Sequence, residues 1–182
     1  MHKYRITGPD AEVVLNRLAT RDVRIEAGFV VTGVEFSSTP KTIRRHRGRT
    51  PFESGMGHMV HFDKPHFNGR RALLQHQQNG PRYMLVGLDI EGDKPAKDAY
   101  VYHNRKKVAG QVNAAMWPPM LKSNIALAML KAPYGIDVTE NLWVEIYTLQ
   151  KLKWGRLMMR AKIVERPFLK LPRRRANPPG CF

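Results

Sequence analysis

One short stretch of the sequence contains three histidines and an aspartate, which are side chains that could bind a metal ion. The three histidines His58, His61 and His66 surround Asp63. Imidazole and carboxylate together can bind zinc, but this spacing matches no defined metal motif. The single cysteine, Cys181, leaves no disulfide or cysteine-based site within the chain. We therefore expect no metal, and no glycine-rich phosphate loop or nucleophile elbow identifies a catalytic residue.

Basic residues dominate the charge of the chain. Lys and Arg number 31 against 15 Asp and Glu, giving a formal net charge of +16 over 182 residues. They cluster at residues 41–49 and 173–175. Runs of charge are commonly exposed loops, and no aromatic-interleaved RNA signature accompanies these two. We expect no nucleic-acid partner, although a basic nucleic-acid-binding module is one alternative.

The cellular compartment of the protein is predicted from features that the sequence lacks. No apolar run approaches the length that spans a bilayer. The opening MHKYRITGPD has no apolar core of a secretory signal. These features, with the single cysteine, predict a cytoplasmic protein without a membrane partner.

Two apolar runs around a proline corner organise the chain. The runs cover residues 108–117 and 125–130, and Pro118 and Pro119 stand between them. Proline lacks the N–H of a ladder, so neither can sit inside a central strand. The pattern predicts two buried strands joined by a sharp corner.

Shorter strand-like segments surround this pair, at residues 83–90, 100–102 and 157–164. A further segment alternates with a period of two, placing Leu142, Val144 and Ile146 on one face. We expect these three side chains inside. Glu145 should point to solvent and tolerate glutamine, because a buried unpaired carboxylate is costly. About six short strands with turns between them predict a closed or nearly closed antiparallel β-barrel over residues 82–170.

Helices are expected before the barrel, which makes the fold class α+β. Residues 10–20 carry an apolar stripe at helical spacing. A second helix should start at Gly69, capped by Asn68, and stop at Asn79-Gly80-Pro81. A Lys153-Trp154-Gly155 turn should precede the last strand. The tail 171–182 is rich in Pro and Arg and is expected to be disordered.

Several blocks then resemble a known family. RITGPDAEVVLNRLATRDV resembles the opening of folate-dependent one-carbon transferases related to the glycine cleavage system T-protein (aminomethyltransferase). RIEAG resembles their pterin-binding strand, and FDKPHFNGRRALL resembles their F-x-G-[RK]-x-A-L segment. RYMLVGLDIEG, VYHNRKKVAGQVNAAMWPPMLKSNIALAML and ERPF look like their C-terminal barrel. The blocks occur in the family's order over most of residues 4–170.

The resemblance implies a domain organisation. Residues 1–81 would be a partial N-terminal folate-binding domain, 82–170 the C-terminal barrel and 171–182 the basic tail. In the family, a long stretch separates the GPDA helix from the RIEAG strand, and it carries an aspartate that assists catalysis. Here Val23 runs directly into Arg24. The chain therefore resembles an internally deleted or fragmentary member, with activity expected to be impaired.

The resemblance also implies a tetrahydrofolate site. The carboxylate of Glu26, in the EAG motif, would accept two N–H groups of the pterin ring. The cations Lys64, Arg70 and Arg82 would bind the carboxylates of the folate's glutamate tail. Arg70 has an alternative role as a solvent-facing charge at a helix start.

The implied function is a tetrahydrofolate-dependent methyl or aminomethyl transferase of the T-protein type or of the related demethylases. Its donor would be a small methylated or aminomethylated compound, or the lipoyl group of a carrier protein. The alternative is a non-catalytic folate-binding relative, like those that assist iron–sulfur assembly.

Overall fold

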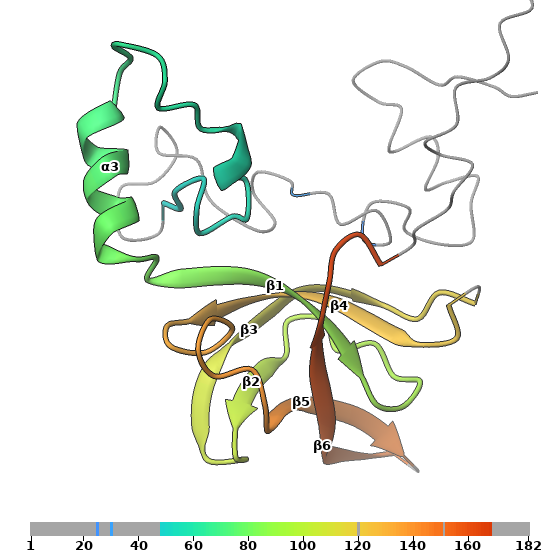
Figure 1. Cartoon of the computed structure of the whole chain (residues 1–182). Helices are drawn as coiled ribbons and strands as arrows, with labels where there is room; N and C mark the ends of the chain where they lie inside the picture. Colours follow the sequence, from blue (N-terminus) through green and yellow to red (C-terminus); the bar gives the residue numbers. More distant parts are fainter. Residues whose placement is uncertain (1–24, 26–29, 31–47, 120, 151, 169–182) are drawn as a thin grey trace, which may run out of the picture.

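The computed structural model describes residues 25, 30, 48–119, 121–150 and 152–168 (Figure 1). The elements in these ranges are η3 (Gly57–Met59), α3 (Arg70–Asn79), β1 (Tyr83–Ile90), β2 (Tyr100–His103), β3 (Lys107–Met116), β4 (Asn124–Lys131), β5 (Leu142–Gln150) and β6 (Lys153–Val164). None of the helices described is both long and apolar enough to cross a membrane. The helix expected at residues 10–20, Glu26, the basic stretch up to residue 47 and the 171–182 tail lie outside the described residues.

Six strands close into an antiparallel barrel in the order β1-β4-β3-β2-β5-β6 (Figure 1), which confirms the predicted architecture. β1 pairs with β4 along its whole length, from Tyr83 opposite Lys131 to Ile90 opposite Asn124. The second half of β1 pairs with β6 and closes the ring. The prolines lie between β3 and β4, as expected.

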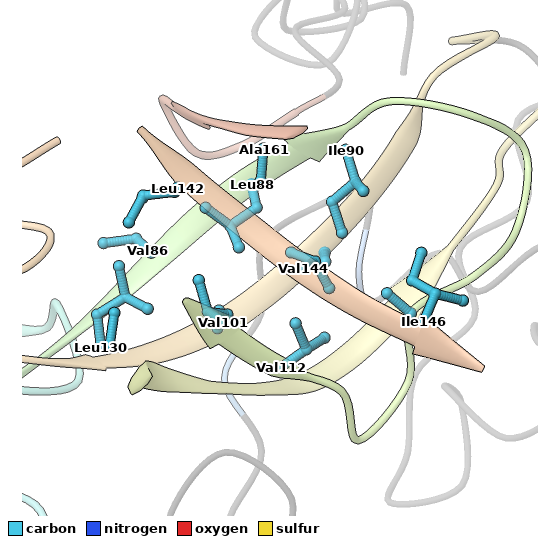
Figure 2. Close-up of a cluster of buried hydrophobic side chains, with 14 residues drawn as sticks. Val86, Leu88, Ile90, Val101, Val112, Leu130, Leu142, Val144, Ile146 and Ala161 are labelled. Carbon is cyan, nitrogen blue, oxygen red and sulfur yellow. The ribbon is translucent and has the colours of Figure 1, made fainter. Parts of the chain in front are cut away.

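The barrel interior holds the main core, shown in Figure 2. Leu142, Val144 and Ile146 point into it with at most 4% exposure, which confirms the predicted register of β5. Burying a side chain of this size stabilises the fold by about 1.5–3 kcal/mol. The labelled members come from all six strands: Val86, Leu88, Ile90, Val101, Val112, Leu130, Leu142, Val144, Ile146 and Ala161.

A second cluster covers the outer face of β1, β3 and β4. Leu85, Leu127 and Met129 point outward and pack with Ile25 and, more loosely, Phe168. β4 is therefore buried on both faces, and seven of its eight residues are buried. This double burial explains why its sequence is continuously apolar rather than alternating.

The start of α3 differs from the sequence expectation. The N-cap is Gly69 rather than Asn68, and no side chain caps the helix. Gly69 has φ of +87°, a left-handed conformation that glycine adopts without strain. The helix itself, Arg70–Asn79, ends at the predicted Gly80.

The β5–β6 hairpin is longer than predicted. The turn expected at Lys153-Trp154-Gly155 is wrong, because all three residues lie in β6. Cross-strand pairing continues to Gln150 opposite Lys153. Glycine weakens a strand but does not prevent pairing, and Gly155 is paired with Thr148.

The outer face of β5 corrects a third expectation. Glu145 does point away from the barrel interior, but it is only 6% exposed. Tyr147 donates a hydrogen bond to it, and Arg156 on β6 lies 3.0 Å from its Oε1. The carboxylate is buried because these neighbours cover it and pair with it. Replacement by glutamine should therefore change the stability of the fold.

Candidate functional site

A buried carboxylate, Glu53, lies at the centre of the segment that precedes α3. The chain turns tightly here, with Ser54 N–H donating to Thr50 O and Met56 N–H to Pro51 O. Thr50 N–H donates to Glu53 Oε2 at 3.1 Å, and Glu53 N–H donates to Thr50 Oγ1 at 3.3 Å. This reciprocal pair fixes the side chain, which is fully buried.

The other carboxylate oxygen faces two cationic or ionisable groups. Glu53 Oε1 lies 3.7 Å from His76 Nε2 and 3.6 Å from Arg82 Nε. These separations allow electrostatic attraction but exceed normal hydrogen-bond lengths. Among the described residues, Oε1 receives no hydrogen bond. A buried acceptor of this kind is suited to hold cations in place or to accept an N–H group that approaches it.

Aromatic rings join this segment to α3. Phe67, Phe62, Phe52 and His76 form a row with neighbouring ring centroids 5.9–6.4 Å apart. His76 belongs to α3, and the three phenylalanines come before the helix. Offset ring contacts at these distances are favourable. The row therefore sets where the helix lies relative to Glu53.

Backbone and side-chain contacts fix the same segment to the barrel. Leu85 N–H in β1 donates to Glu53 O at 2.9 Å. Gly55 lies against the guanidinium of Arg166, which follows β6, and a Cβ at this position would collide with it. Burial lowers the pKa of Arg166. The segment thus touches both β1 and the chain that leaves β6.

A groove of about 960 Å³ opens at the start of α3. His66, Arg70 and Arg71 line it, and none of the described residues in its lining is Asp or Glu. Arg70 Nη2 donates to Phe62 O at 3.3 Å, which orients the side chain. A concave site with cations and no acids favours an anionic ligand, and its volume is in the usual range for ligand sites.

The structure separates the predicted site residues. Arg70 lines the groove, whereas Arg82 is 61% exposed at its side chain and faces Glu53. Lys64 is exposed and is not part of the groove lining. Glu26 lies outside the described residues, but its neighbour Ile25 is buried in the outer cluster of the barrel. The roles of these residues stay predictions.

Among the described residues, the three histidines near Asp63 form no metal site. His58, His61 and His66 are all exposed. Within the described ranges, no three His, Cys, Asp or Glu side chains are close enough to hold a metal ion.

Glu53 and His76 were missed by the sequence reasoning. The Thr50-x-x-Glu53 spacing is the pattern of a reciprocal capping pair, so the local fixation of Glu53 had a readable signal. The approach of His76, 23 positions further along, depends on how α3 packs. No local pattern contains that information.

The glycine cleavage T-protein C-terminal barrel domain is the family model that matches, over residues 84–170. The chain is 34% identical over 160 residues to an aminomethyltransferase of Synechococcus elongatus, covering 87% of this chain and 38% of that protein. It is 37% identical over 158 residues to an aminomethyltransferase of Prochlorococcus marinus, covering 85% of this chain and 37% of that protein.

A solved structure shares the fold. The glycine cleavage system aminomethyltransferase T of Bartonella henselae superimposes with a TM-score of 0.61 at 22% identity. The match covers 81% of this chain and 37% of that protein. The chain thus spans less than two fifths of the length of each of these relatives.

Proposed function

The chain belongs to the glycine cleavage T-protein (aminomethyltransferase) family, and from this premise we propose that it serves tetrahydrofolate-dependent transfer of a methyl or aminomethyl group. The observation that carries the proposal is the groove at the start of α3, lined by Arg70, Arg71 and His66 and, among the residues that the structure describes, by no acid. The groove fits the carboxylates of a folate's glutamate tail, because a guanidinium binds carboxylate through two parallel N–H bonds.

The residues divide the work of binding. Arg70, held by Phe62 O, would present its remaining N–H groups to the tail. Glu53 would act indirectly, by holding Arg82 and His76 beside the segment. Glu26 keeps its predicted role at the pterin ring. Tetrahydrofolate, when bound, supplies the nitrogen atoms that accept the one-carbon unit, and the protein orients the two ligands and excludes water.

Paired titrations test the role of the groove. Calorimetry would compare tetrahydrofolate carrying one glutamate with a polyglutamylated form, in wild type and in Arg70→Gln. We expect Arg70→Gln to weaken binding of the polyglutamylated form by at least about tenfold, since a hydrogen bond to a charged group contributes about 1.5–3 kcal/mol. Lys97→Gln, an exposed cation in the β1–β2 connection, is the control. Absence of binding by the folded chain would refute the proposal.

The donor is tested by turnover. We propose a small methylated or aminomethylated compound, or an aminomethyl group on the lipoyl arm of a carrier protein. Transfer from such a donor to tetrahydrofolate would support a transferase. Folate binding without transfer from any of them would instead support the non-catalytic alternative. The proposed setting is the cytoplasm.

A further inference from the structure

The tip of the β5–β6 hairpin exposes four large apolar side chains. Tyr147, Leu149, Leu152 and Trp154 are 60%, 55%, 92% and 72% exposed. Leu149 and Trp154 are directly opposite each other across the two strands, and Tyr147 is opposite Arg156. Since side chains of paired residues share a face of the sheet, Tyr147, Leu149 and Trp154 lie on one face, and Leu152 stands in the turn at its end. In Figure 1 the tip projects from the barrel on the side away from α3.

Leu152 is unusual in conformation as well as in exposure. Its φ is +63°, in the left-handed region that turns normally fill with Gly, Asn or Asp. A bulky apolar side chain in this conformation gains no packing within the described chain, because 92% of its surface is exposed. The fold of the hairpin therefore does not account for a leucine at this position.

The charge around the tip has one sign. Residues 147–156 contain Lys151, Lys153 and Arg156 and no acidic residue. Arg156 is already paired with Glu145 beside the tip, and Lys153 is exposed. The outermost part of the hairpin is thus apolar, and the exposed Lys153 lies beside it. The whole chain, with a net charge of +16, adds attraction to any anionic surface.

We propose that this tip docks on the surface of an anionic lipid membrane. Leu149, Leu152 and Trp154 would enter the boundary between headgroups and acyl chains, while Lys153 approaches lipid phosphates. Tryptophan and tyrosine are enriched at that depth because their rings have an apolar body and a polar edge. The contact is peripheral and adds no membrane-spanning element.

The shape and chemistry of the tip favour lipid over other partners. Its apolar groups stand on a projecting turn, and they line neither the groove at the start of α3 nor the smaller groove beside Gly110. Tyr147 and Trp154 can stack on bases, but Leu149 and Leu152, the second of which is the most exposed group of the tip, offer a nucleic acid neither stacking nor hydrogen bonds. A fluid lipid surface, in contrast, accommodates a projecting apolar turn without a matching cavity.

Vesicle sedimentation with the full chain tests the proposal. The probes are vesicles of phosphatidylcholine mixed with phosphatidylglycerol, and vesicles of phosphatidylcholine alone. Leu152→Asp should lower partitioning onto the anionic vesicles by at least about tenfold, because a charged group replaces an inserted apolar one. Met59→Asp is the matched control, since Met59 is 66% exposed outside the barrel and the charge change is the same. Unchanged thermal unfolding verifies that both variants are folded.

Tryptophan emission supplies the second readout. We expect a blue shift when wild type meets anionic vesicles, and no such shift in Trp154→Phe, which keeps Trp117 and Trp143. An equal loss of binding in Leu152→Asp and Met59→Asp would reduce the effect to general charge attraction and overturn the proposal. Failure of wild type to sediment with anionic vesicles would also overturn it and assign the tip to a protein partner.

Discussion

Single side chains on the outer face of β5 give the barrel a specific response to pH. Hydrogen bonds from Tyr102 and Tyr147, with the charge of Arg156, hold the pKa of Glu145 below its ordinary value of 4.5. The same carboxylate raises the pKa of both tyrosines above 10.0. The network therefore joins β2, β5 and β6 through a group that must be ionised and two that must be neutral.

The sign of the pH effect follows from these directions. Because the folded pKa of Glu145 is lowered, its contribution to stability is complete above about pH 4.5 and is lost as pH falls through the folded value. The tyrosines, with raised pKa, contribute below pH 10 and lose this as pH rises. We expect Glu145→Gln to flatten the acid limb of the stability profile, measured as the urea midpoint against pH. Exposed Glu140→Gln should keep that limb, and an unchanged limb in Glu145→Gln would contradict the network.

At the scale of the secondary-structure elements, the close approach of β3 to β4 depends on a glycine in β3. A Cβ built on Gly110 would collide with the carbonyl oxygen of Met129 and press on Leu130. For Gly155 in β6, the nearest described atom to such a Cβ is the carbonyl oxygen of Thr148, at 3.8 Å. Gly110 and Gly155 thus differ in their effect: the first allows close approach of a neighbouring strand, and the second only interrupts the side-chain surface.

Replacing both glycines in turn tests this difference. Gly110→Ala should destabilise the chain by about 1–3 kcal/mol, because the strands must separate to admit the methyl group. Gly155→Ala should be nearly neutral by the same chemical denaturation measurement. Equal effects would show that loss of glycine flexibility, and not contact with β4, is the cause.

How far the sequence predicts an element depends on where its partners lie. The bounds of β1 and the double burial of β4 were readable because apolar patterns record them locally. The length of β6 was not, since pairing with β5 overrides the turn preference of Gly155. The burial of Glu145 and the approach of His76 to Glu53 depend on neighbours from other elements, which no local pattern encodes.

At the scale of the whole molecule, the two outer sides of the barrel differ in how much apolar surface they expose. The outer face of β1, β3 and β4 packs under Ile25 and Phe168. The face of β5 and β6 instead carries the exposed hairpin tip. The described members of the interior core all come from β1 to β6 and the connections between them, whereas the outer cluster includes Ile25, from before the barrel.

A shortened chain tests this division. Residues 82–170 alone should fold cooperatively, because the interior core is intact, but melt at a lower temperature than the full chain. Leu85, Leu127 and Met129 would lose part of their cover, so binding of a hydrophobic dye should increase. Circular dichroism and dye fluorescence measure the two effects. A shortened chain without strand signal would show that the barrel depends on the N-terminal residues for folding.

The closure of the ring between β1 and β6 has a consequence for how the protein is made. Gly87 in β1, the first strand, pairs with Val164 in β6, the last strand. In contrast, the paired strands β3 and β4 follow each other in the sequence and are joined by a short corner. Long-range pairings of this kind are slow to form, because the loop between them must close first. During synthesis on the ribosome, β1 emerges well before its β6 partner and can meet only β4. The nascent barrel therefore passes through an open sheet, and its solubility in the cell depends on how quickly the last strand arrives.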